Sequence, residues 1–198
     1  MIAAPCPVNR TAYNNATPEK VNLQFNHILS RLSIKVAKGN NISEDQDLIL
    51  KSLDVVGLKN QGSFDESKAE ADMTAKIARW EVAGDKVYTL PAVKLNNKVT
   101  TAVYTHQYLV IPQSVKYAEI DTDGSDTKGE VYFHIQYSID DENYYAYYNL
   151  ANAFKSDVLN FNEGWENTLT ITINPSHIRF DAEVSEWEDF TTPGQTIK

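Results

Sequence analysis

Cysteine is nearly absent from this sequence of 198 residues, and long hydrophobic runs are missing altogether. Because Cys6 is the only cysteine, neither an intrachain disulfide nor a cysteine-based zinc site can form. No run of about 18 apolar residues is present to span a bilayer. Residues 1–7 lack the basic start and the long apolar core of a signal peptide, which leaves a cytosolic protein or an export signal upstream of Met1. Pro5 stands where a lipoprotein signal has a small residue, so Cys6 is interpreted as an incidental thiol.

Positive charge is also in short supply. Lys and Arg number 18 against 27 Asp and Glu, so the formal net charge is −9. A surface of this charge repels phosphate backbones and anionic lipid headgroups, and it has no basic stripe to replace condensed counterions. We therefore expect no nucleic-acid partner.

Motifs for catalysis and cofactor binding are missing as well. No His-Glu-x-x-His pattern, Gly-x-Ser-x-Gly elbow, P-loop or Gly-x-Gly-x-x-Gly occurs. The acidic run 121–126 fails the EF-hand pattern, and the neighbouring Asp140 and Asp141 cannot face each other across a sugar. The four histidines are isolated in the sequence: His27, His106, His134 and His177. The sequence thus predicts no catalytic site, no metal and no cofactor.

Residues that suit a pleated, half-buried surface are abundant, with 11 Tyr, 7 Phe and 3 Trp beside many Val, Ile and Thr. Apolar and polar residues alternate over 21–26, which is typical of a strand with one buried face. The parity then changes to Leu32, Ile34 and Val36, so we expect a bulge or a short helical turn in between. Stretch 66–80 fits either a short helix or an irregular loop. Further strands are predicted at about 48–58, 86–90, 102–111, 130–139, 143–150, 167–174 and 177–187.

The spacing of these strands predicts the fold class. The clearest hairpin joins 130–139 to 143–150 through a tight connection at Asp140-Asp141-Glu142-Asn143. About seven short strands without βαβ spacing favour an all-β, antiparallel sandwich with Greek-key connections. We expect one domain at 21–190, after an extended Pro- and Asn-rich lead-in at 1–20 and before a flexible tail at 191–198.

The period of two also predicts which side chains fill the core between the two sheets. We expect one buried set: Phe25, Leu32, Ile34, Leu53, Val55, Leu109, Phe133, Ile135, Leu169, Ile171, Ile173, Phe180 and Val184. The last predicted strand should end with Trp187 packed near its end.

Tyrosines are concentrated in the predicted hairpin. Strand 143–150 carries two on each face, and one more lies on the strand before it. A phenol ring buries a large area and keeps a polar tip, so these residues suit core edges, subunit interfaces and sugar stacking alike. The candidate interface or sugar-stacking residues are Tyr137, Tyr144, Tyr145, Tyr147 and Tyr148.

Both ends of the predicted domain resemble a known protein family. Residues 21–36 (VNLQFNHILSRLSIKV) and the closing pair of strands at 165–173 and 178–187 are similar to the fimbrillin family of the Bacteroidia. Gly57-Leu58, residues 62–64 and residues 108–113 fit the same order, so the likeness covers about 21–190, the part that corresponds to the family's C-terminal domain.

The resemblance implies a transthyretin-like β-sandwich that is exported as a lipoprotein to the outer membrane and the cell surface. It implies a structural or adhesive fimbrial subunit, in the pilus stalk, the tip or the anchor, whose partners are other subunits joined by β-strand addition. A host or bacterial surface protein or glycan is a further expected partner. The alternative is a glycan-binding surface module, and a hydrolase would need two carboxylates that converge in a pocket.

Overall fold

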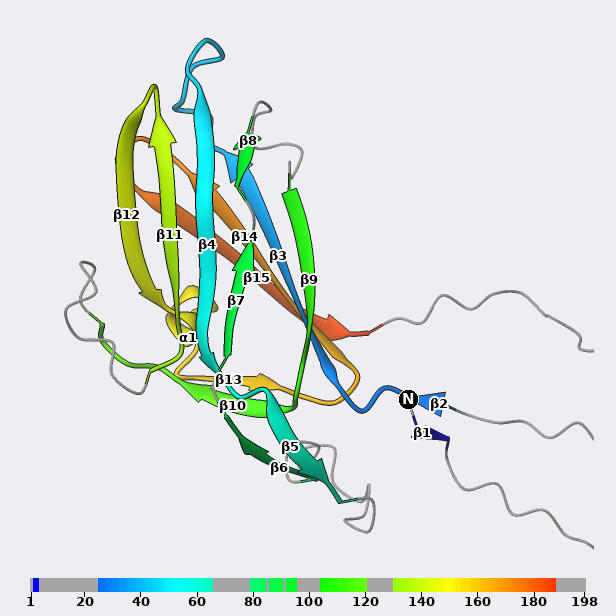
Figure 1. Ribbon diagram of the computed structural model, residues 1–198. Coiled ribbons are helices and arrows are strands. Elements are labelled where there is room, and N and C mark those ends of the chain that lie inside the picture. The colour runs from blue at the N-terminus through cyan, green and yellow to red at the C-terminus, as the bar shows by residue number, and fades with distance from the viewer. Residues whose placement is uncertain are drawn as a thin grey trace, which may run out of the picture.

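A computed structural model describes residues 2–3, 25–65, 79–84, 86–90, 92–95, 104–120 and 130–187. Across these residues the fold is all-β, and the long strands lie in two layers (Figure 1). One short helix, α1 (Leu150–Ala153), follows the hairpin. The predicted β-sandwich is confirmed. Residues 66–78 of the undecided stretch, residues 4–24 and the tail lie outside the described residues.

The first sheet has five strands and is antiparallel throughout. Two neighbouring strands form the predicted hairpin, and β8 pairs with β4 further along the same edge that β7 occupies. In order, the strands are β12 (Glu142–Asn149), β11 (Tyr132–Ile139), β4 (Leu48–Leu58) and β7 (Lys86–Leu90), with β8 (Val93–Leu95) beside β4.

The second sheet has four strands: β15 (Ile178–Glu186), β14 (Trp165–Ile173), β3 (Ser30–Lys38) and β9 (Tyr104–Val110). Its central pair, β3 and β14, is parallel, so the expectation of antiparallel pairing throughout was wrong at this point. The expected number of about seven strands was too low, since these two sheets alone have five and four. Alternation within a strand specifies its buried face but not its direction, and the long connection from β3 to β14 allows a parallel return.

Three short two-stranded ladders accompany the sheets, each of them antiparallel. In one of them, residues 2–3 of the predicted lead-in pair with residues 25–26. Residues 27–29 then form no strand, at the place where the sequence predicts a break in parity. The ladders are β1 (Ile2–Ala3) with β2 (Phe25–Asn26), β10 (Gln113–Lys116) with β13 (Val158–Phe161), and β5 (Gln61–Phe64) with β6 (Trp80–Ala83).

The hairpin turn between β11 and β12 has two residues with positive φ, Asp140 at 48° and Asp141 at 68°. Such a pair matches the right-handed twist of the flanking strands. The Asp140 carboxylate accepts hydrogen bonds from the backbone N–H of Asp47 and the side-chain amide of Gln46, both at 2.9 Å. The turn therefore fixes the register of the hairpin and ties it to the loop before β4.

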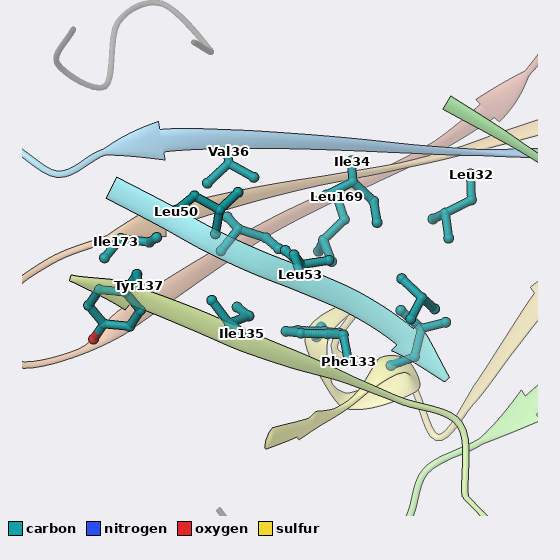
Figure 2. Close-up of a cluster of buried hydrophobic side chains, with 14 of the residues drawn as sticks. Leu32, Ile34, Val36, Leu50, Leu53, Phe133, Ile135, Tyr137, Leu169 and Ile173 are labelled. Carbon is teal, nitrogen blue, oxygen red and sulfur yellow. The ribbon is translucent and has the colours of Figure 1, made fainter. Parts of the chain in front are cut away.

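The core lies between the two sheets, where side chains of β4 and β11 point toward those of β3 and β14 (Figure 2). Ring contacts join the layers: the centroids of Phe133 and Phe180 are 5.3 Å apart, and those of Tyr88 and Tyr108 are 4.9 Å apart. Most of the predicted core is buried, and Phe180 packs partly buried against it. The side chain of Phe25 lies outside the described residues.

Two predicted core residues are exposed, Leu109 at 56% and Val184 at 44%. In β9 the apolar run contains no alternation, and the pairing of Leu32 with Tyr108 places Tyr108 and Val110 on the inner face and Leu109 outside. Val184 does have the inner-face parity of its strand, but no described strand of the first sheet covers that end of β15.

The end of β15 is fastened to the start of the domain. Trp187 stacks on His27 with ring centroids 3.9 Å apart, and the Arg31 guanidinium lies 4.6 Å from the Trp187 ring. The backbone N–H of Trp187 donates to the Gly164 carbonyl at 2.7 Å. Arg31 also forms an ion pair with Glu166 on β14. The predicted packing of Trp187 near the end of the closing strand is confirmed.

Candidate functional site

The five candidate tyrosines divide between the two faces of the hairpin. Tyr137 pairs with Tyr144 across the strands, and these rings stack with centroids 5.2 Å apart. Tyr148 contacts Phe133 and Phe180, with ring centroids 5.6 and 4.8 Å away. These three tyrosines lie on the inner face, where Tyr137 belongs to the core, as Figure 2 shows. They therefore serve packing between the sheets.

The surroundings of the inner tyrosines keep their hydroxyls protonated. Burial raises the pKa of Tyr148, and it raises the pKa of Tyr137 together with the nearby phenols of Tyr148 and Tyr144. A hydrogen bond to Glu142 raises the pKa of Tyr144. Because the ordinary value is 10.0, all three are neutral phenols at physiological pH.

Tyr145 and Tyr147 point to the outer face, beside side chains of β11. Tyr147 stacks on His134 with a centroid distance of 4.3 Å and an interplanar angle of 12°. His134 in turn lies with Nδ1 3.9 Å from the Asp54 carboxylate on β4 and with Nε2 3.5 Å from the Gln136 amide. Tyr145 stands next to this row and is 64% exposed, the largest value among the exposed hydrophobic side chains of the described residues.

A bulge in β4 adds a cation to the same face. The register between β4 and β11 shifts at Gln136/Tyr137, where Ser52 and Leu50 are the partners and Lys51 is the extra residue. Lys51 is thereby exposed, and its ammonium donates a hydrogen bond to the Asn143 side-chain oxygen. The bulge explains why a lysine reaches across β11 to the neighbouring strand β12.

These outer side chains, together with Tyr137 and Tyr144 from the inner face, line an open hollow of about 410 Å³, which we call the hairpin hollow. Its lining residues are Lys51, His134, Gln136, Tyr137, Asn143, Tyr144, Tyr145 and Tyr147. Its tyrosines were predicted as candidates from the sequence, whereas His134, Gln136, Lys51 and Asn143 were not. The hairpin could have revealed two of them, because a two-residue turn places His134 opposite Tyr147 and Gln136 opposite Tyr145. The bulge that presents Lys51 has no comparable signal in the sequence.

A second hollow of about 410 Å³ runs beside β15, and we call it the edge groove. Within the described residues, β15 pairs only with β14, so its other edge carries backbone groups without a strand partner. The walls are Phe154, Lys155, Ser156, Val158, Leu159, Asn160, Asn162, Ala182 and Val184. Val158 is 43% exposed and Val184 is 44% exposed, so the groove presents apolar side chains next to an open strand edge.

Within the described residues, no three His, Cys, Asp or Glu side chains come together in a way that could hold a metal ion. None of the helices in this part of the chain is long and apolar enough to cross a membrane.

Comparison with known proteins gives one family. The family model described as fimbrillin-like matches residues 1–187. No curated protein matches the chain.

Solved structures from Bacteroides are also similar to the chain. A candidate cell adhesion protein from Bacteroides uniformis has 14% identity and a TM-score of 0.45 over 84% of this chain and 53% of its own. A fimbrial protein from Bacteroides vulgatus has 14% identity and a TM-score of 0.38 over 85% of this chain and 57% of its own. The chain thus spans about half the length of these two structures.

Proposed function

Because this chain belongs to the fimbrillin-like family, we propose that it is a structural or adhesive subunit of cell-surface fimbriae. The observation that carries the proposal is the family match, which extends over residues 1–187. The proposed place of action is the cell surface, and the proposed action is assembly and adhesion rather than catalysis.

We infer further that a neighbouring subunit joins this one by adding a strand at β15. Backbone N–H and C=O groups at an open edge bind an extended segment without requiring a particular side chain. β15 offers nine residues for such pairing. An added strand would extend the order of the second sheet beyond β15.

The edge groove supports this position over the other sheet edges. Four residues of β15 share its inner face. Ile178 and Phe180 pack against the core, whereas Ala182 and Val184 line the edge groove. Val158 of β13 faces the same groove. Apolar side chains of an added strand would cover these residues, at roughly 25 cal/mol for each Å² of apolar surface buried. The groove therefore offers apolar contacts in addition to backbone pairing.

A charge placed in the groove tests the strand-addition step. Val184→Lys puts an ammonium into the groove, and lysine at an edge disfavours strand addition. Ser185→Lys adds the same charge to the adjacent residue of β15, whose side chain points to the opposite face, so it is the matched control. Tagged chains are produced in a fimbriated Bacteroides host, and incorporation is measured by immunogold labelling and by immunoblots of sheared fimbriae.

We expect wild type and Ser185→Lys to label surface filaments and Val184→Lys to label them several-fold less, at equal melting temperatures of the purified chains. Incorporation of Val184→Lys at the wild-type level would contradict strand addition at β15. Absence of the wild-type chain from surface filaments would contradict the fimbrial function itself.

A further inference from the structure

The hairpin hollow combines an exposed tyrosine ring with amide side chains. We propose that it binds a neutral sugar, either at the end of a surface glycan or within it. Its volume of about 410 Å³ lies within the range of about 300–1,000 Å³ that holds small ligands in proteins. The proposal concerns the outer face of β11 and β12, whereas the proposed assembly uses the edge of β15. The two are therefore independent.

Tyr145 supplies the stacking surface. It is 64% exposed, and among the described residues no other ring packs on it, in contrast to Tyr147, which is stacked on His134. One face of a pyranose ring carries C–H groups that pack on the face of an aromatic ring, and the phenol keeps its hydroxyl in contact with water. The Tyr147–His134 stack stands beside Tyr145 as a wall of the hollow.

Polar side chains lie around this ring in a pattern that suits sugar hydroxyls, each of which both donates and accepts hydrogen bonds. Gln136 is directly opposite Tyr145 in the hairpin, and its amide offers a donor and an acceptor. Asn143 lies two residues along β12 on the same face, about 7 Å away by the strand repeat. Its side-chain oxygen accepts a hydrogen bond from the Lys51 ammonium, and its amide nitrogen carries two further donors. A few placed polar groups beside an apolar surface are what orients a ligand in such sites.

The charges at the hollow favour a neutral glycan over an acidic one. Lys51 is engaged by the neutral Asn143, and the Asp54 carboxylate lies close to the His134 ring. The hollow thus contributes one cation and one nearby carboxylate, on a chain whose net charge is −9. The net negative charge of the chain would repel a sialic acid or a sulfate group, and the hollow would offer that group a single ammonium as a partner.

A protein partner is less well suited to this hollow. A stable protein interface covers roughly 800 Å² on each partner and has a fully buried, largely apolar centre. Among the side chains that line the hollow, Tyr145 is the large, strongly exposed hydrophobic one. Its neighbours are the amides of Gln136 and Asn143 and the ammonium of Lys51. One aromatic face with polar neighbours fits a sugar ring.

A glycan array tests the proposal with the purified chain. The array carries neutral oligosaccharides of glucose, galactose, mannose and N-acetylhexosamines, together with sialylated and sulfated counterparts. We expect binding to at least one neutral oligosaccharide, with the charged counterparts bound more weakly. Tyr145→Ala should weaken the binding about ten-fold, and Tyr145→Phe, which keeps the ring, should retain most of it.

Tyr117→Ala is the matched control, because Tyr117 is also exposed, at 43%, and lies after β10 away from the hollow. Melting temperatures equal to wild type for all three variants show that the fold is intact. The proposal is wrong if wild type binds no neutral oligosaccharide, if it binds charged glycans alone, or if Tyr145→Ala binds as well as Tyr117→Ala. If Tyr145→Ala instead lowers incorporation into fimbriae without any sugar binding by wild type, the hollow is a protein interface and the sugar is overturned as its ligand.

Discussion

Phe133 offers a direct measure of how strongly the two sheets depend on each other. Its side chain is 1% exposed, and its ring contacts Phe180 of the opposite sheet at 5.3 Å and Tyr148 at 5.6 Å. Phe133→Ala removes a whole buried ring, so we expect a loss of about 3–5 kcal/mol in the free energy of unfolding. For a chain of this length each kcal/mol corresponds to roughly 2–4 °C, which gives a melting temperature about 6–20 °C lower.

Urea unfolding followed by tryptophan fluorescence measures this loss. The midpoint should fall while the m-value stays constant, because the variant changes the stability of the fold and not the surface exposed on unfolding. Domains are stable by only about 5–15 kcal/mol, so Ile135→Val, with an expected loss of about 0.5–1.5 kcal/mol at a fully buried site, provides a second variant that remains folded.

A double-mutant cycle with Phe180→Ala isolates the contact between the sheets. The coupling between Phe133 and Phe180 should be about 0.5–1.5 kcal/mol, as for other paired aromatic rings. Leu109→Ala is the control, since this side chain is 56% exposed and its loss should change stability by no more than about 0.5 kcal/mol. A larger loss for Leu109→Ala than for Phe133→Ala, or zero coupling in the cycle, would refute the assignment of these faces.

Two further predictions concern charge and backbone strain. Partial burial raises the pKa of Glu166, but hydrogen bonds from Arg31 and Ser33 outweigh it and hold the pKa below its ordinary 4.5. The ionised carboxylate therefore stabilises the fold above that pH. The urea midpoint of wild type should exceed that of Glu166→Gln by its full amount at pH 7, and the difference should shrink from about pH 4.5 downward. A difference that grows on acidification would contradict this. In the hairpin turn, Asp141→Gly relieves a positive φ and should leave the free energy of unfolding unchanged or raise it by up to about 1 kcal/mol. Asp140→Gly also removes the hydrogen bonds from Gln46 and Asp47, so it should lower the free energy of unfolding by about 1–3 kcal/mol. Equal melting temperatures for the two variants would count against the role of the Asp140 carboxylate.

The bounds of the longer strands follow closely from local patterns. β4 was expected at about 48–58 and runs from Leu48 to Leu58, and the hairpin of β11 and β12 was expected from the polar connection at 140–143. Alternation works here because each of these strands has one face toward the core, so the period of two is present in the residues themselves. In β9 the consecutive apolar residues carry no such period, and Leu109 was assigned to the wrong face for that reason.

The division of the tyrosines shows the same limit at the candidate site. The pattern of strand 143–150 separates Tyr144 and Tyr148 from Tyr145 and Tyr147, but it does not say which pair is buried. That depends on Phe180, which belongs to the other sheet and contacts Tyr148. The hairpin hollow adds Lys51, which reaches it through a bulge that the alternation of β4 does not indicate.

Local chemistry was thus enough for the all-β class, most strand bounds, the hairpin and the larger part of the core, because these depend on side-chain period and turn residues between near neighbours. The parallel pairing of β3 with β14, the exposure of Val184 and the two hollows depend on segments far apart in the chain. A strand's own residues specify which of its faces is apolar. They do not specify which strand lies beside it, in which direction, or whether another layer covers its end, since those are settled when the sheets pack together.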